Sequence, residues 1–164
     1  MESSRKCNTC KVMKPITAFE KMFSRNGSPC YRRRCRKCNR KIRNDETNKD
    51  PLKFLRRNFT QLRSARKIKG EKSWDLSWQD ILDIWLKCKG KCQVSGIKMT
   101  HKRDGTGKKL YTNISIDRID NDIGYKKENI RLVCWAVNIM KHNMSDTELM
   151  LWVSRIHDAS RSRL

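Results

Sequence analysis

The sequence predicts an α+β protein, and three patterns in the chain support this prediction. Four cysteines arranged in two pairs near the amino terminus indicate a small metal-stabilised module. Apolar residues at helical spacing follow, from Pro51 to about Gly70. Two short apolar runs separated by turn-forming residues then lead into a helix between Asn113 and Asn143, which predicts a strand–loop–strand–helix unit. We therefore expect a basic cysteine module over 1–44, a basic amphipathic linker helix over 45–73, and a domain built on that unit over 74–164.

The cysteine pairs are Cys7-Asn-Thr-Cys10 and Cys35-Arg-Lys-Cys38. Four thiolates with C-x2-C spacing are enough to close a tetrahedral structural Zn²⁺ site. A module of this size cannot bury enough apolar surface to fold by itself, so the metal is expected to supply the missing stability. Cys30 lies between the pairs. It is either a substitute ligand or, as we favour, a spare buried thiol.

The remaining cysteines, Cys88, Cys92 and Cys134, leave a second metal site open, because His101 or His142 would complete it. Thiols packed in the core are the simpler interpretation. Disulfides are not expected, because they are typical of secreted proteins and the amino terminus has no apolar signal segment. We expect an intracellular protein, in a bacterial or phage-infected host cytoplasm, with no membrane-spanning run.

The net charge of the chain is +22, from 39 Lys and Arg residues against 17 Asp and Glu residues. Residues 1–73 hold +17 of this charge and residues 74–164 hold +5. Such an excess indicates a polyanionic partner, because neutralising phosphates releases condensed counterions. We expect that partner to be DNA, with an RNA-binding or ribosome-associated role as the less favoured alternative. The candidate nucleic-acid-binding residues are Arg32, Arg33, Arg34, Arg36, Arg40, Arg56, Arg57, Arg63, Lys102, Arg103 and Lys108.

Capping residues predict where the helices begin. Asp50 and Pro51 start the basic helix, after a polar linker over 44–50. Ser77 and Ser145 each precede an apolar-periodic run and act as N-caps. The apolar side chains expected to pack inward are Ile16, Phe19 and Phe23 in the cysteine module, Leu52, Leu55, Phe59 and Leu62 in the basic helix, Trp78, Ile81, Leu82, Trp85 and Leu86 in the helix after Ser77, and Leu149, Trp152, Val153 and Ile156 in the last helix.

The strand–loop–strand–helix unit places several polar residues at its corners. Apolar residues alternate with polar ones from Ile114 in the first strand and from Ile130 in the second, as in half-buried strands. The following helix is expected to turn Ile139 inward. Asn138 and His142 are four residues apart, which predicts that they share one face of that helix. The candidate site residues are Asp117, Arg118, Asn129, Asn138 and His142.

These residues resemble the ββα-metal motif of HNH (His-Me finger) endonucleases, including the phage endonuclease VII group, in which a four-cysteine module is also found. Asp117-Arg118 stands where the family has Asp-His or His-His, Asn129 at the loop asparagine, and Asn138 and His142 at the positions of the helical ligands. The resemblance implies hydrolysis of phosphodiester bonds in double-stranded or branched DNA. It also implies a Mg²⁺ or Mn²⁺ ion held by Asp117 and Asn138, and a loop braced by Asn129.

One position departs from the family pattern. The family's general base is a His, and this chain has Arg118 there. A guanidinium stays protonated in proteins, so Arg118 cannot be that base, although it can clamp a phosphate. Asp120, His101, His142 or solvent hydroxide are the candidate replacements. Two functions follow: an HNH-type endonuclease or nickase, which we favour, and a non-catalytic nucleic-acid-binding protein (a regulator or DNA-protecting factor) in which Asp117 and Arg118 form a structural ion pair.

Overall fold

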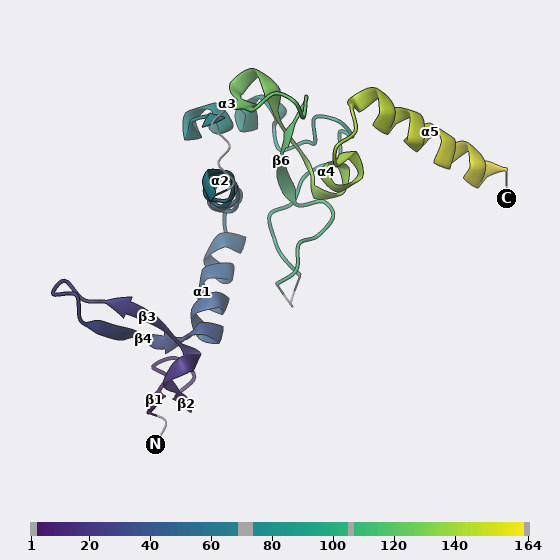
Figure 1. The fold of residues 1–164 in the computed structure, drawn as a ribbon. Coiled ribbons are helices and arrows are strands. Elements are labelled where there is room, and N and C mark those ends of the chain that lie inside the picture. The colour runs from purple at the N-terminus through teal and green to yellow at the C-terminus, as the bar shows by residue number, and fades with distance from the viewer. Residues whose placement is uncertain (1–2, 69–73, 105–106, 163–164) are drawn as a thin grey trace. The chain divides into compact units, whose positions relative to one another are not determined.

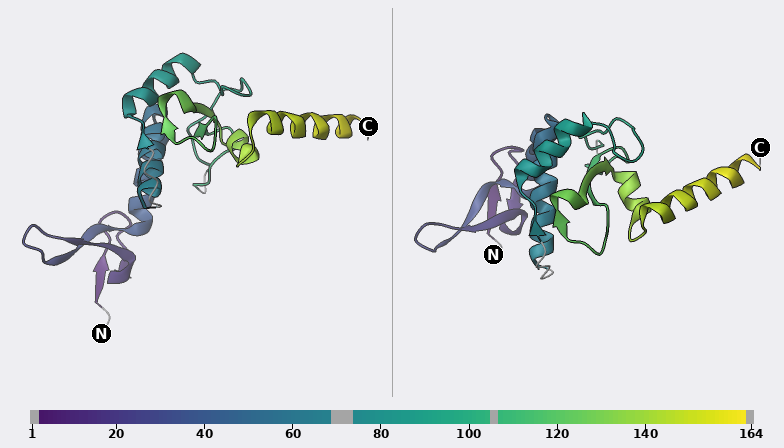
Figure 2. Two further views of the ribbon diagram at one scale, coloured as in Figure 1. Left: turned by 45° about the horizontal axis from the view of Figure 1, so that its top comes forward. Right: turned by 90° about the horizontal axis from the view of Figure 1, so that it is seen from above.

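The computed structural model describes residues 3–68, 74–104 and 107–162. The chain divides into two compact units, one running to Glu46 and the other beginning at Thr47. Helices and strands both contribute to the fold (Figures 1 and 2), so the predicted α+β class is confirmed. No described helix combines the length and the apolar character that crossing a membrane requires.

Two small antiparallel sheets and a helix build the first unit. Strand β1 (Ser4–Lys6) pairs with β2 (Met13–Pro15), and β3 (Phe19–Phe23) pairs with β4 (Pro29–Cys35). Helix α1 (Arg36–Asn48) follows β4 directly. The buried apolar cluster of the described residues here consists of Cys7, Phe19 and Cys35, whereas Phe23, expected inside, is 68% exposed. So few buried side chains cannot hold a unit of this length without further stabilisation.

Helix α1 also occupies most of the segment for which the sequence predicts a polar linker. The sequence predicts the linker over 44–50, but the helix continues to Asn48. Lys41 and Asp45 are four residues apart, a spacing at which opposite charges support a helix, so polarity alone does not indicate a loop. Asp50 then caps the next helix, because its carboxylate accepts a hydrogen bond from the Leu52 N–H at 2.8 Å.

The second unit is organised around the antiparallel pair of β6 (Ile114–Arg118) and β8 (Ile130–Cys134). Helices α2 (Pro51–Ile68) and α4 (Trp135–Lys141) pack against β6, while α3 (Trp78–Cys88) and α4 pack against β8. The last helix, α5 (Asp146–Arg161), contacts α4. The short strands β5 (Trp74–Asp75) and β7 (Tyr125–Lys126) form a parallel pair, and 3-10 turns occupy Ile16–Ala18 and Lys127–Asn129.

The central strands are buried on both faces, although their alternating pattern predicts half-buried strands. Ser115 and Asp117 are as inaccessible as Ile114 and Ile116, because helices cover the pair. Polar side chains of β6 are therefore held away from water. The core around these strands consists of Phe54, Leu55, Phe59, Leu76, Ile81, Ile84, Cys92, Met99, Ile114, Ile116, Tyr125, Ile130, Leu132, Val133, Cys134, Val137 and Leu149.

Local capping signals agree with the structure. Ser77 and Asp80 form a capping box at the start of α3, and Ser145 and Glu148 form one at the start of α5. In α2 the predicted Leu55 and Phe59 are buried, whereas Leu52 is partly exposed and Phe54 takes its place in the core. The helix end expected near Gly70 lies outside the described residues.

Several apolar faces differ from the prediction. In α3, Leu86 is exposed. In α4, Val137 and Lys141 are buried while Ile139 is exposed, because the ammonium of Lys141 finds polar partners inside. In α5, the expected inward stripe is covered only at Leu149. The prediction for Trp152, Val153 and Ile156 is wrong, since all three are exposed.

Candidate functional site

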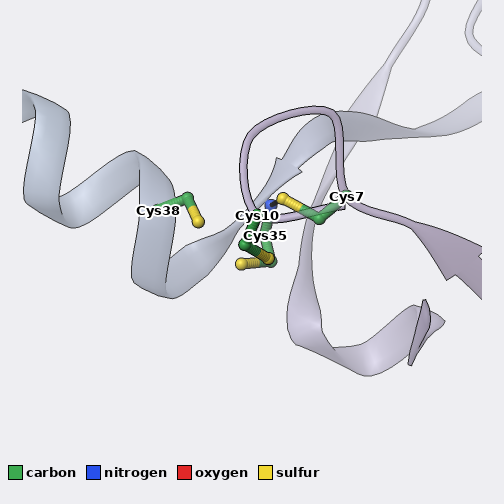
Figure 3. A group of neighbouring side chains, drawn as sticks. All are labelled: Cys7, Cys10, Cys35 and Cys38. Atoms are coloured by element: carbon green, nitrogen blue, oxygen red, sulfur yellow. Dashed lines mark hydrogen bonds between the residues drawn. The ribbon is translucent and has the colours of Figure 1, made fainter. Parts of the chain in front are cut away.

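Four cysteine sulfurs meet in the first unit. The Sγ atoms of Cys7, Cys10, Cys35 and Cys38 all lie within 4.8 Å of one another (Figure 3). The first pair follows β1, Cys35 ends β4, and Cys38 lies in the first turn of α1. The predicted grouping of the four cysteines is confirmed, and such a set can hold a metal such as zinc.

Backbone N–H groups stabilise the thiolate forms of the buried members of this cluster. Hydrogen bonds from the N–H groups of Cys35 and Cys10 lower the pKa of Cys7 to about 5. The hydrogen bond with Cys35, together with burial, raises the pKa of Cys38 to about 12. Four thiolates this close would repel one another, so without a metal some of the thiols keep their protons. A bound cation displaces those protons and neutralises the negative charge of the thiolates. A tetrahedral set of four sulfurs is the coordination that structural zinc uses.

The other cysteines lie outside this cluster. Cys30 sits in β4 opposite Met22. Cys92 and Cys134 belong to the core of the second unit, where burial raises the pKa of Cys134 to about 11. Within 3–68, 74–104 and 107–162, the four-cysteine group is the only set of three or more His, Cys, Asp or Glu side chains close enough to share a metal. The geometry therefore favours core thiols, buried at Cys92 and Cys134 and partly buried at Cys88, over a second metal site.

Asp117 forms a buried ion pair between the strands. Its Oδ2 accepts a hydrogen bond from Arg131 Nε at 2.9 Å, and its Oδ1 lies 4.0 Å from Lys141 Nζ. The side chain of Asp117 is 4% exposed and that of Lys141 is fully buried. The ion pair between Asp117 and Arg118 considered from the sequence is replaced by this one. Adjacent strand residues point to opposite faces, and the strand register places Arg131 opposite Asp117.

Arg131 extends this pair into a network that reaches α5. Its two terminal nitrogens donate to the carboxylate of Asp146, and these hydrogen bonds lower the pKa of Asp146. Burial raises the pKa of Asp117, against the opposing effect of the bond from Arg131. Lys141 also donates to the carbonyl oxygen of Arg118 at 2.9 Å. The sequence prediction missed Arg131, Lys141 and Asp146, because their relation to Asp117 appears only when the strand register and helix packing are known.

Arg118 contacts an aromatic cluster. Its guanidinium carbon lies 5.2 Å from the ring centroid of Tyr125, a cation–π distance. Tyr125 is buried and stacks on Trp74, with ring centroids 4.9 Å apart. Arg66 also lies over the Tyr125 ring, at 5.3 Å. The half-exposed Arg118 is thus oriented by a fixed ring, and a guanidinium so placed suits phosphate contact better than proton abstraction.

Asn129 braces the loop between the two central strands. Its Oδ1 accepts a hydrogen bond from the Asp120 N–H at 2.8 Å. Its Nδ2 lies 2.9 Å from the carbonyl oxygen of Asp120, and 3.1 Å from those of Ile123 and Gly124. The side chain is 6% exposed. One side-chain amide therefore lies within hydrogen-bond distance of four backbone groups, and its two N–H donors are shared among three carbonyl oxygens, which ties the loop to the start of β8.

Asn138 lines a cleft of about 330 Å³ on α2, β6 and α4. Its Nδ2 donates to Ser115 Oγ at 2.7 Å. Ser115 and Asp117 are two residues apart in β6 and point to the same face, so Asn138 and Asp117 share that side of the strand. Burial lowers the pKa of Lys109, which lines the same cleft. The remaining lining residues are Asn58, Gln61, Leu62, Ile116 and Trp135.

The three side chains that the sequence offers as a general base in place of Arg118 lie in different settings. Helix α4 ends at Lys141, so His142 leaves the helical face of Asn138 and has a φ of 45°. His142 is exposed, contrary to the expected alignment. Asp120 is exposed in the loop, where its carboxylate accepts from the Asp122 N–H at 2.8 Å. His101 lines a separate pocket of about 740 Å³.

Candidate nucleic-acid-binding residues of the first unit lie mostly on its surface. Arg32, Arg33 and Arg34 are exposed along β4, and Arg36 and Arg40 are exposed on α1. Arg32 pairs with Glu20 at 2.8 Å, and Arg36 Nε donates to the carbonyl oxygen of Phe19. Because both partners of the Arg32 pair remain close to half exposed, that pair is readily exchanged for a phosphate.

The second unit contributes a less uniform set of cations. Arg56 stacks on Trp78 at 5.1 Å, and together with Arg63 it lines a pocket of about 560 Å³. Arg57 is half-buried, whereas Lys102 and Lys108 are exposed. Arg103 donates to the carbonyl oxygen of Gly107, and its Nε is buried without a hydrogen-bond partner. Arg103 thus stabilises its own loop, whereas the exposed side chains of Lys102 and Lys108 are accessible to a phosphate.

Comparison with protein-family models and with curated proteins finds no match. Among solved structures, the rare-cutting HNH restriction endonuclease PacI is similar to this chain. The sequence identity is 18%, the likeness covers 97% of this chain and 97% of that chain, and the TM-score is 0.46. At this identity and TM-score, the likeness assigns neither a family nor an activity to the chain.

Proposed function

We propose that the chain is a DNA-binding, metal-dependent nuclease of the HNH type, an endonuclease or nickase that hydrolyses phosphodiester bonds in double-stranded or branched DNA. The observation that carries the proposal is the order of β6, the loop braced by Asn129, β8 and α4, as the resemblance to HNH enzymes requires. Within it, Asp117 and Asn138 lie on one side of β6. Both offer oxygen atoms, which hard divalent cations prefer.

Asp117 and Asn138 are the residues that would hold Mg²⁺ or Mn²⁺. Such an ion, when bound, stabilises the charge that develops on the scissile phosphate and its leaving oxygen. The oxygen donors suit the ion, but the carboxylate of Asp117 already accepts a hydrogen bond from Arg131. Asp117 must therefore exchange a protein cation for the metal. Arg118, held on Tyr125, would contact the phosphate.

The rest of the chain supports DNA binding. The net charge of +22 and the exposed arginines of β4 and α1 supply phosphate contacts. The cysteine cluster, loaded with zinc, would hold this basic unit in one conformation, since its apolar core is small. In this proposal the basic unit grips the duplex and the second unit presents the ββα site.

A non-catalytic nucleic-acid-binding protein, a regulator or DNA-protecting factor, is the second candidate. The buried ion pair favours it, because Arg131 and Lys141 neutralise Asp117 without a metal. Arg118 favours it too, since a guanidinium cannot take a proton from water. In this alternative the basic surfaces bind DNA and no bond is cut.

A nicking assay separates the two candidates. Purified chain is incubated with supercoiled plasmid and with a branched DNA junction, in Mg²⁺ or Mn²⁺, beside the Asp117→Asn and Asn138→Ala variants. Asp83→Asn, which alters a partly exposed carboxylate of α3 paired with Lys127, is the matched control. The proposal expects the wild type and the control to nick, and both site variants to lose at least a factor of about 100 in rate.

The other outcomes have equally definite meanings. Binding without nicking in every metal establishes the non-catalytic function. Nicking that persists in both site variants moves the active site away from Asp117 and Asn138. Circular dichroism of each variant separates loss of chemistry from loss of the fold.

A further inference from the structure

A surface groove of about 740 Å³ lies in the second unit, and the proposed function gives it no role. It is lined by Pro51 at the start of α2, by the end of α3 and the turn that follows, and by residues from 98 to 102 together with Leu110. Its volume falls within the roughly 300–1,000 Å³ of pockets that bind ligands. None of the described residues that line it belongs to β6, β8 or α4, so the groove is separate from the ββα site.

The floor of the groove is apolar. Met99 is 6% exposed, Leu110 is 38% exposed and Leu86 is 71% exposed. The half-buried Trp85 forms part of the wall. The sequence predicts Leu86 in the core, yet its side chain meets solvent at the groove. An apolar recess of this kind gains free energy when a partner covers it.

The backbone around the groove fixes its shape. Lys89 and Gly90 have φ angles of 50° and 73°, which end α3 and turn the chain back. The Met99 N–H donates to the carbonyl oxygen of Gly90 at 2.8 Å and so ties the two sides of the groove together. The ring of Trp85 lies 3.5 Å from where a Cβ at Gly90 would stand. A groove that is already formed spares a partner the cost of ordering it.

The rim of the groove is basic. Lys89, Lys98 and Lys102 are exposed and line it, together with His101, and no carboxylate is among the described lining residues. In the part of the chain that the structure describes, none of these three ammonium groups pairs with a carboxylate. An apolar floor inside a positive rim is complementary to a partner that carries apolar and acidic groups together.

DNA and membranes fit this combination poorly. DNA offers phosphates to the lysines, but contacts to its backbone leave an apolar floor uncovered. A bilayer takes up apolar side chains that project from a protein, whereas these line a recess. A polypeptide can carry carboxylates and large apolar side chains a few residues apart, and protein interfaces commonly have an apolar centre within a polar rim.

We propose that this groove is a docking site for an acidic peptide segment of another protein. The large apolar side chains of the segment cover Leu86 and Leu110, and its carboxylates pair with Lys89 and Lys98. The groove shares no lining residue with the cleft at Asn138, so a docked segment leaves that cleft accessible. Peptide binding is independent of the proposed nuclease activity, and either can fail without the other.

Fluorescence anisotropy tests the docking site with a defined probe. A fluorescein-labelled peptide, Asp-Asp-Asp-Leu-Phe-Asp-Asp, is titrated with the full zinc-loaded chain, free of nucleic acid, in about 0.15 M salt. The wild type is expected to bind it with a Kd of about 1–100 µM, as is usual for a segment that is ordered on binding. Leu86→Asn should weaken binding about tenfold, because apolar area is lost from the interface. Lys98→Glu should weaken it about fivefold, because a carboxylate then faces the acidic peptide.

The controls separate docking from the attraction that a chain of net charge +22 exerts on any polyanion. Ile156→Asn alters an apolar residue of α5 that is 67% exposed, and Lys126→Glu makes the same change of charge on the exposed side of β7. Both variants should bind the peptide within about twofold of the wild type, because solvent screens distant charges. A peptide with Ser in place of Leu and Phe should bind at least about tenfold more weakly. Circular dichroism verifies that each variant is folded.

Four results would overturn the proposal. The first is a wild type that does not bind the apolar acidic peptide at about 1 mM. Equal affinity for the peptides with and without Leu and Phe would mean that net charge alone attracts them. Equal affinity of the Leu86→Asn and wild-type proteins would place the binding outside the groove. A Leu86→Asn protein that loses affinity for a duplex oligonucleotide to the same degree would assign the groove to DNA.

Discussion

Replacement of Arg131 by leucine tests the central ion network of the second unit. Arg131 is 10% exposed and bridges Asp117, which is 4% exposed, to the half-exposed Asp146. Leucine removes the guanidinium and leaves an apolar side chain in the strand. Asp146 can then turn to water, but Asp117 remains buried, with Lys141 at 4.0 Å as its nearest remaining cation.

The loss of stability in Arg131→Leu depends mainly on the buried carboxylate of Asp117, which loses its hydrogen-bond partner. Breaking one side of a buried ion pair typically destabilises a protein by about 3–5 kcal/mol. For a unit of this length that corresponds to a loss of roughly 12–20 °C in Tm. The matched control is Lys127→Leu, which breaks pairs with Asp80 and Asp83 whose members are 21–45% exposed. That change should cost less than about 1 kcal/mol, because solvent screens exposed pairs.

The pH dependence identifies Asp117 as the cause. Burial raises the pKa of Asp117 in the folded protein above its unfolded value, so the folded state prefers the protonated carboxyl. The penalty for burying its charge is therefore relieved as the pH falls through the folded pKa. Removing Arg131 raises that pKa further, and the stability deficit of Arg131→Leu should be largest near pH 7 and smaller near pH 5.

Urea unfolding of both variants at the two pH values measures these differences. A loss of stability in Arg131→Leu no greater than that in Lys127→Leu would rule out a buried, Arg131-dependent charge at Asp117. A stability deficit of Arg131→Leu that grows as the pH falls would do the same. Either result would mean that Asp117 is solvated or paired elsewhere, and that it is free to bind a cation without exchange.

Three further results are expected. Metal analysis should find about one Zn²⁺ per chain, lost in Cys7→Ala and kept in Cys30→Ala, because only the first residue belongs to the cluster. Asn129→Ala removes the side-chain partner of the Asp120 N–H and of the carbonyl oxygens of Asp120 and Ile123, so it should cost about 2–4 kcal/mol and speed amide exchange in the loop selectively. Ser77→Ala removes the side-chain cap of α3 and should lower the free energy of unfolding by about 1 kcal/mol in chemical denaturation.

Much of the local structure follows from the sequence. The C-x2-C pairs around Cys7 and Cys35 indicate a shared metal site because this short spacing lets both thiols of a pair reach one ion. Ser77 and Ser145 fix the starts of two helices because a cap acts within four residues. The apolar alternation from Ile114 and the turn formers after Arg118 predict the strand and the loop for the same local reason.

What only the tertiary structure decides is which partner each side chain meets. The register of β6 against β8 gives Asp117 an arginine that lies 14 residues away along the chain, and helix packing turns Lys141 inward in place of Ile139. Periodicity shows that α5 has an apolar stripe, but it contains no information on whether another element reaches Ile156 to cover it. Secondary structure is encoded by neighbours in sequence, whereas ion pairing and burial depend on contacts between distant segments.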